Sequence, residues 1–190
     1  MWIIEKEMKK SNNNLPVSRF RTDRRMLGMV LLMLLWGSFR SFGQKQVLVF
    51  FDVECPICQK SSKRVQEMYE QYHKEVDFKL IFPVKSVKKS DIRKFKREYL
   101  LTIPTVRDRN HTLVEQYDAK VTPEVIVLDN NGSEYYRGAI DNQFFELGKN
   151  RPKMTEFYLK DALDGLLNNQ PKPQSYKAVG CIINRKKRKL

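Results

Sequence analysis

Apolar and polar positions follow two different patterns along the chain from residue 45 onward. Val47–Phe51 is a continuous apolar run of strand length, which predicts a central strand covered on both faces. From Pro56 to Tyr72 the apolar side chains recur at helical spacing and predict an amphipathic helix. A second apolar run, Val76–Phe82, predicts another strand. A strand, a helix and a strand in this order favour a parallel sheet with flanking helices.

The central part of the chain predicts a basic helix over Ser90–Tyr99, with Ser90 or Asp91 as its N-cap. The segment Ile103–Asn110 is expected to hold a short strand, and Thr112–Tyr117 one or two helical turns. The apolar stripe of the basic helix consists of Ile92, Phe95 and Tyr99.

The last third of the chain has a clearer pattern. Glu124–Leu128 is β-rich, residues 129–132 are turn residues and a second strand begins at Glu134, so an antiparallel hairpin is predicted. Lys153–Leu167 is expected to be the final helix. We therefore expect an α/β domain over residues 44–170, in which helices flank a central mixed sheet, followed by an extended tail over residues 171–190.

Residues 1–43 have the pattern of a secretory signal peptide. Three arginines precede the uncharged stretch Met26–Phe39, whose 14 residues are fewer than the roughly 20 that cross a bilayer as a helix. Ser41 and Gly43 place small residues at positions −3 and −1 of a cleavage site. We expect an exported, periplasmic or extracytoplasmic protein, with an uncleaved membrane anchor as the alternative.

The formal net charge of +14 is unevenly spread: residues 1–43 hold eight Lys and Arg against three Asp and Glu and account for +5, and the rest of the chain accounts for +9. Basic charge can bind nucleic acid or an anionic membrane surface. We interpret it as a solvated surface and expect no nucleic-acid partner. Association with a membrane surface, through this charge or an uncleaved leader, stays an alternative.

The most specific motif is Cys55-Pro56-Ile57-Cys58, which joins the first predicted strand to the first predicted helix. Backbone N–H groups and the dipole at a helix N-terminus stabilise a thiolate, and proline suits the first helical position. Cys55 is therefore the candidate nucleophile. Cys58, one turn further along, is the candidate resolving thiol that would attack a mixed disulfide.

This cysteine pair has two other interpretations: buried thiols, and half of a zinc site. A structural zinc site usually needs a second pair of ligands, and only Cys181, His73 and His111 remain in the chain. Each histidine is better interpreted as a surface or partly buried residue than as a ligand. The strand, Cys-Pro-x-Cys and helix together favour redox chemistry.

A second feature is the Thr122-Pro123 step directly before the predicted strand Glu124–Leu128. An X-Pro bond at a strand entrance is a candidate for the cis isomer.

With these features the chain resembles the thioredoxin superfamily. The segments VLVFFDVECPIC, VTPEVIVLDNNGSEYYRGAID and AVGCII are similar to exported redoxin domain proteins of the AhpC/TSA and thioredoxin-like grouping, over nearly all of residues 45–184. The resemblance implies a thioredoxin-like fold in which Thr122 and Pro123 pack against the dithiol and offer backbone to an incoming peptide. It also implies protein thiols and disulfides as substrates.

The chain departs from its relatives at several positions. Glu54 stands where thioredoxin has Trp, and Val49 stands where thioredoxin has a buried acid. Leu48 and Asp52 stand where the Pro-x-x-x-Thr-x-x-Cys motif of a peroxiredoxin has its Pro and Thr. These departures count against peroxidase activity.

The third cysteine, Cys181, follows Gly180 on the tail, where glycine allows close backbone approach. Two interpretations stay open: a third redox thiol for Cys55 or Cys58, or a buried small apolar residue. If the three sulfurs converge, they would also suit Cu(I).

We therefore expect an exported thiol–disulfide oxidoreductase that needs no cofactor and acts with a separate redox partner. The alternatives are a copper-binding protein on the same fold, with Cu(I) held by Cys55, Cys58 and Cys181, and a peroxiredoxin-like enzyme. Copper chaperones of related fold carry Cys-x-x-x-Cys and a distal His near the hairpin, which this chain lacks.

Overall fold

The computed structural model describes residues 43–185. The predicted signal peptide over residues 1–43 therefore lies, apart from Gly43, outside the described residues, and so does the end of the tail from residue 186. Between residues 43 and 185 no helix is long and apolar enough to span a membrane.

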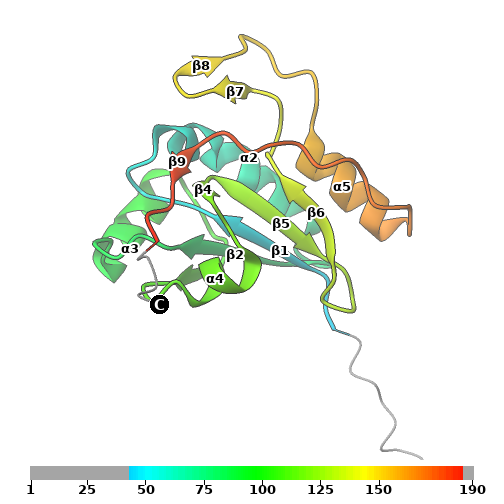
Figure 1. The fold of residues 1–190 in the computed structure, drawn as a ribbon, viewed down its shortest axis with the longest axis horizontal. Coiled ribbons are helices and arrows are strands. Elements are labelled where there is room, and N and C mark those ends of the chain that lie inside the picture. The colour runs from blue at the N-terminus through cyan, green and yellow to red at the C-terminus, as the bar shows by residue number, and fades with distance from the viewer. Residues whose placement is uncertain (1–42, 186–190) are drawn as a thin grey trace, which may run out of the picture. The chain divides into compact units, whose positions relative to one another are not determined.

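The centre of the domain is a five-stranded sheet with the strand order β3-β2-β1-β5-β6 (Figure 1). The three strands β1, β2 and β3 are parallel, while β5 is antiparallel to β1 and β6 is antiparallel to β5. The expected mixed sheet is thus confirmed. Its strands are β1 (Gln46–Phe50), β2 (Asp77–Phe82), β3 (Thr105–Arg107), β5 (Glu124–Leu128) and β6 (Glu134–Gly138).

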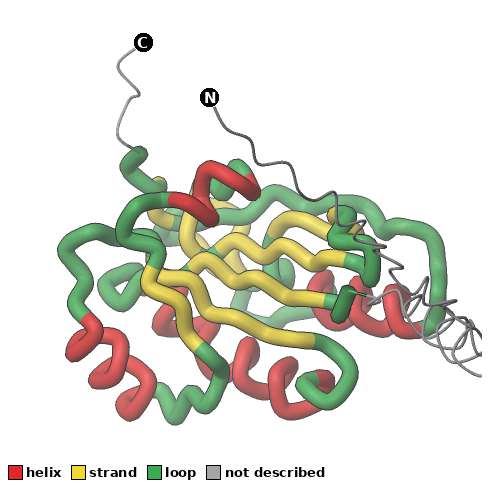
Figure 2. Tube along the Cα trace, turned by 90° about the horizontal axis from the view of Figure 1, so that it is seen from below, coloured by secondary structure: helices red, strands yellow, loops and turns green. Residues whose placement is uncertain are grey.

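Helices cover both faces of the sheet (Figure 2). Three helices, α2 (Pro56–Tyr72), α3 (Lys89–Glu98) and α5 (Tyr158–Leu167), contribute to the larger core cluster, and α4 (Thr112–Tyr117) contributes to a smaller one. Because successive strand residues point to opposite faces, β1 sends Val47 and Val49 into the larger core and Leu48 and Phe50 into the smaller. Burial on both faces explains the continuous apolar run.

Helices α2 and α4 have the predicted bounds. The basic helix α3 differs at its start, because Lys88, rather than Ser90 or Asp91, is its N-cap. Asp91 lies in the first turn, where its carboxylate accepts a hydrogen bond of 2.8 Å from the backbone N–H of Lys88. The acidic residue therefore completes a capping box from inside the helix.

The final helix begins at Tyr158, so the predicted start at Lys153 was wrong. Asn142 holds the intervening segment, since its side chain accepts from the Thr155 backbone N–H at 3.1 Å and donates to the Thr155 hydroxyl at 2.8 Å. These two bonds tie Thr155 to the loop that contains Asn142. A small hairpin of β7 (Phe144–Glu146) and β8 (Lys149–Asn150), which the sequence did not predict, precedes this segment.

The tail returns to the domain after α5. The backbone N–H of Ala139 donates to the carbonyl of Tyr176 at 2.9 Å. Further on, β9 (Cys181–Ile182) pairs antiparallel with β4 (Val121–Thr122), and Figure 1 shows the red end of the chain beside β4. The expected extended tail is confirmed as far as residue 185, but its pairing with β4 was not foreseen.

Candidate functional site

Cys55 lies at the junction between β1 and α2. It is the N-cap of α2 and its backbone is extended, with φ −75° and ψ 117°. Pro56 occupies the first turn, and no acidic residue follows in that turn to oppose a negative charge at this end of the helix. The Cys55 sulfur therefore lies where the helix dipole favours a thiolate.

Cys58 lies one turn into α2 and is completely buried. Its sulfur accepts a hydrogen bond of 3.4 Å from the backbone N–H of Asp52. Cys55 is also buried, at 1% exposed, so the two cysteines differ in their hydrogen-bond partners rather than in their exposure.

The Thr122–Pro123 peptide bond is cis, as the sequence predicted. The carbonyl oxygen of Thr122 lies 3.2 Å from the Sγ atom of Cys55 and can accept a hydrogen bond from its thiol form. The fold thus places Thr122 and Pro123 beside the dithiol, although they lie more than sixty residues from it in sequence.

Cys181 also reaches the dithiol. Its Sγ atom lies 3.0 Å from the Sγ atom of Cys55 and donates a hydrogen bond to it. In the β4–β9 pair Cys181 stands opposite Thr122. Cys55, which is 1% exposed, therefore lies against the tail on one side and β4 on another.

The three thiols divide into one acidic and two weakly acidic groups. Hydrogen bonding from Cys58, opposed by burial and aided by Cys181, lowers the pKa of Cys55 to about 4. Burial, together with the neighbouring Cys55 charge, raises the pKa of Cys58 well above its usual range and that of Cys181 to about 12. At neutral pH the negative charge therefore resides on Cys55 and the protons on the other two sulfurs.

The Asp52 carboxyl group interacts electrostatically with these thiols. Burial is the main cause that raises its pKa, and the negative charge on Cys55 acts in the same direction, whereas a hydrogen bond from the backbone of Glu54 opposes both. Asp52 has two opposite effects on the pKa of Cys58: its backbone hydrogen bond lowers this pKa, and the charge of its carboxylate raises it, both to a lesser extent than burial and Cys55.

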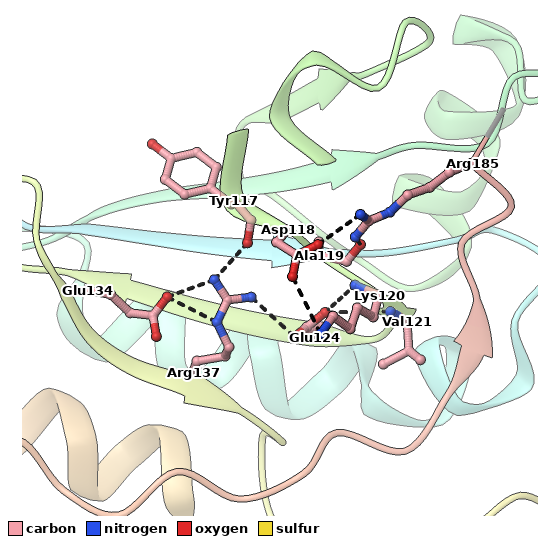
Figure 3. Close-up of polar contacts among 9 residues, drawn as sticks. All are labelled: Tyr117, Asp118, Ala119, Lys120, Val121, Glu124, Glu134, Arg137 and Arg185. Carbon is pink, nitrogen blue, oxygen red and sulfur yellow. Dashed lines mark hydrogen bonds and ion pairs between the residues drawn. The ribbon is translucent and has the colours of Figure 1, made fainter. Parts of the chain in front are cut away.

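A buried carboxylate that the sequence analysis missed holds the loop before Pro123. Glu124 accepts from the backbone N–H of Lys120 at 2.6 Å, and its other oxygen pairs with Arg137 at 3.3 Å (Figure 3). Arg137 also donates to the carbonyl of Tyr117 at 2.6 Å. An acidic residue that opens an apolar strand was the available signal for this role.

The cavity beside Pro123 has a volume of about 20 Å³ and is lined partly by Ile57, Phe144 and Val179. This volume suffices for about one water molecule. A larger cavity of about 440 Å³, lined partly by Arg64 and Met68 of α2, does not include the cysteines. Neither of these two cavities is lined by Cys55 or Cys58.

The two histidines lie away from the sulfurs. His111 is buried, and its Nε2 atom lies 2.7 Å from the carbonyl oxygen of Pro83, while His73 caps the C-terminus of α2. Among residues 43–185 no group of three or more His, Cys, Asp and Glu side chains is arranged to hold a metal ion.

The sequence of the domain matches a known family. Residues 43–134 match the family described as thioredoxin-like. No curated protein matches the chain.

The fold is similar to that of several solved structures. An uncharacterized conserved protein from Geobacillus kaustophilus is 22% identical, with a TM-score of 0.66 over 77% of this chain and 79% of that one. A hypothetical protein from Sinorhizobium meliloti is 17% identical, with a TM-score of 0.65 over 75% and 80%. A secreted Mycobacterium tuberculosis disulfide oxidoreductase is 16% identical, with a TM-score of 0.51 over 66% and 84%. The mixed sheet and these structures show that the chain has a thioredoxin-like fold, in agreement with the thioredoxin-like family model that matches residues 43–134.

Proposed function

We propose that this protein is an exported thiol–disulfide oxidoreductase in which Cys55 is the nucleophile and Cys58 the resolving thiol. The observation that carries the proposal is the charge distribution over the sulfurs. Cys55 has a pKa of about 4, while the neighbouring Cys58 keeps its proton. An acidic thiol beside a protonated thiol at a helix N-terminus is typical of disulfide exchange sites.

The reaction would begin when the Cys55 thiolate attacks one sulfur of a substrate disulfide. A Cys55–substrate disulfide forms, and the other substrate sulfur leaves as a thiolate. The Cys58 thiol then gives its proton to a departing thiolate and attacks the Cys55 sulfur, which forms the Cys55–Cys58 disulfide and releases the substrate. Two electrons pass from the dithiol to the substrate, so a separate thiol reductant must restore the pair.

The proposed substrate is a disulfide in a polypeptide, because the exchange site adjoins backbone rather than an enclosed cavity. The Thr122 carbonyl lies 3.2 Å from the Cys55 sulfur, and β4 accepts an antiparallel strand. A substrate segment that pairs with β4 would gain backbone hydrogen bonds beside the reacting sulfur.

Export is proposed on two grounds. The first 43 residues have the composition of a signal peptide. One of the structures with a similar fold is described as a secreted disulfide oxidoreductase. In an oxidising compartment the dithiol would need a dedicated reductant. The net positive charge of the chain would attract an anionic partner or an anionic membrane surface.

Turnover by the full chain tests this function. With dithiothreitol as reductant, the parent chain should catalyse reduction of the interchain disulfides of insulin. Cys55→Ser should reduce insulin no faster than the reductant alone. Equal rates for Cys55→Ser and the parent chain would contradict the proposal.

A further inference from the structure

The C-terminal segment occupies the strand position that a substrate would need. Cys181 stands opposite Thr122 in the β4–β9 pair, and its sulfur lies 3.0 Å from the Cys55 sulfur. A tethered segment of the chain thus presents a cysteine to the nucleophile as a bound substrate would.

Gly180 fits this position in a way that no larger residue would. A Cβ atom at Gly180 would lie 2.1 Å from the carbonyl oxygen of Thr122 and 3.0 Å from the backbone nitrogen of Pro123. A separation of 2.1 Å is impossible for non-bonded atoms, so a side chain here would displace the strand. The residue before the cysteine is therefore matched to the close approach of the two backbones.

The strand is anchored on its C-terminal side. Ile183 is buried in the smaller core cluster, and its backbone N–H donates to the carbonyl of Lys120 at 2.9 Å. Arg185 pairs with Asp118 at 2.8 Å and also donates to the carbonyl of Ala119 (Figure 3). Ile182, between the anchor and the cysteine, is 77% exposed, so the alternation of a strand continues through the segment.

From this geometry we propose that Cys181 is an internal disulfide partner of Cys55, and that the β9 segment is a tethered substrate which competes with external substrates for β4. The inference builds on the proposed function, because it takes Cys55 as the nucleophile. It adds Cys181 as a third redox thiol, and it means that β9 occupies the position on β4 where a substrate would bind.

The internal exchange is balanced without a further oxidant. When a substrate disulfide has oxidised the pair, the Cys181 thiolate attacks the Sγ atom of Cys55. The Cys55–Cys181 bond forms while the Cys55–Cys58 bond breaks, and Cys58 leaves as a thiolate that takes up the proton lost by Cys181. The reverse attack by Cys58 frees Cys181 again, so the number of disulfides is unchanged in either direction.

Disulfide mapping in the full chain with Cys58→Ser tests the inference. The reduced variant is mixed with oxidised glutathione, quenched with acid and analysed by peptide mass spectrometry. The expected product is an intramolecular Cys55–Cys181 disulfide, with glutathione released. A persistent glutathione adduct on Cys55, with Cys181 still free to be alkylated, would overturn the proposal.

Gly180→Ala keeps all three cysteines and serves as the second variant. If the segment is undocked for about a tenth of the time in the parent chain, its release should raise kcat/KM for insulin about tenfold. An unchanged kcat/KM would overturn the competition between β9 and substrate. The mapping needs no turnover, so a chain that forms Cys55–Cys181 yet fails to reduce insulin would refute the proposed function and leave the internal disulfide established.

Discussion

The Sγ atom of Cys181 lies 3.0 Å from the Sγ atom of Cys55, although 126 residues separate the two cysteines. This distance is a close non-bonded contact, since a disulfide bond is about 2.05 Å long. Both residues are free thiols in the structure. At this distance the Cys181 thiol donates a hydrogen bond to the Cys55 sulfur. The Cys181 side chain also contributes to the burial of Cys55, which is 1% exposed.

Cys55 should remain ionised far below the usual range of a thiol. Because hydrogen bonding from Cys58 lowers the Cys55 pKa to about 4, the ultraviolet absorbance of a thiolate should persist at neutral pH and disappear as the pH falls through 4. The Cys55→Ser variant is the control and should lack this transition. A titration near the ordinary value of 9.0 would contradict the assignment.

The same thiol should make the stability of the reduced chain depend on pH. Between pH 4 and 9 the unfolded state holds a proton on Cys55 that the folded state has lost, so this group's contribution to the free energy of unfolding rises with pH. The contribution is complete above 9.0 and is lost as the pH falls to about 4. We expect the parent chain to lose more stability over this interval than Cys55→Ser in chemical denaturation at each pH.

Adjacent isoleucines of the C-terminal segment should differ in their effect on Cys55. Ile183 is 7% exposed and packs in the smaller core cluster, while Ile182 is 77% exposed. Ile183→Ala should weaken docking of the segment by about 2 kcal/mol and speed alkylation of Cys55 about thirtyfold. Ile182→Ala, the matched control, should alkylate at the parent rate, and equal rates for both variants would show that the segment does not cover Cys55.

The buried carboxylate before β5 should contribute more to stability than its exposed neighbour. Glu124→Ala removes one of the two carboxylates on Arg137 and leaves the Lys120 amide without its partner, so we expect a loss of about 2 kcal/mol in the free energy of unfolding. The Glu134 side chain, which also pairs with Arg137, is 43% exposed. Glu134→Ala should therefore lower the free energy of unfolding by less than about 1 kcal/mol. Similar losses in urea denaturation would contradict the role assigned to Glu124.

We expect the negative charge of the Asp52 carboxylate to slow the attack of Cys58 on the mixed disulfide. Burial is the main cause of the high pKa of Cys58, and the Asp52 carboxylate adds to it. Asp52→Asn keeps the backbone hydrogen bond to the Cys58 sulfur but removes the charge, so product release from the mixed disulfide should be faster in single-turnover experiments at neutral pH. Glu54→Gln, an exposed acid two residues further along, is the control and should change this rate less.

The elements of the domain follow from local patterns. The buried strand β1, the helix Pro56–Tyr72 and the β5–β6 hairpin each carry their signal within their own residues. The start of α5 was predicted too early because the groups that hold Thr155 belong to Asn142, in a different segment.

The site was predictable only in part. Cys55 and Cys58 are marked by their spacing at a strand–helix junction, and the cis bond by Thr122-Pro123. Cys181 and Thr122 pair between two strands that are only two residues long, and a strand of this length shows no periodic pattern in the sequence. Gly180 was the one residue that indicated a close approach of two backbones here. The role of Glu124 depends on backbone amides and on Arg137, whose positions only the fold determines.

The central claim is that the Cys55 thiolate attacks a disulfide in a polypeptide, and direct capture of the covalent intermediate tests it. In the full chain with Cys58→Ser and Cys181→Ser, neither neighbouring sulfur can release a bound substrate. After incubation with insulin and acid quenching, peptide mass spectrometry should find an insulin chain joined to Cys55 by a disulfide. A folded double variant that retains Cys55 as a free, alkylatable thiol, with no insulin adduct, would contradict the account.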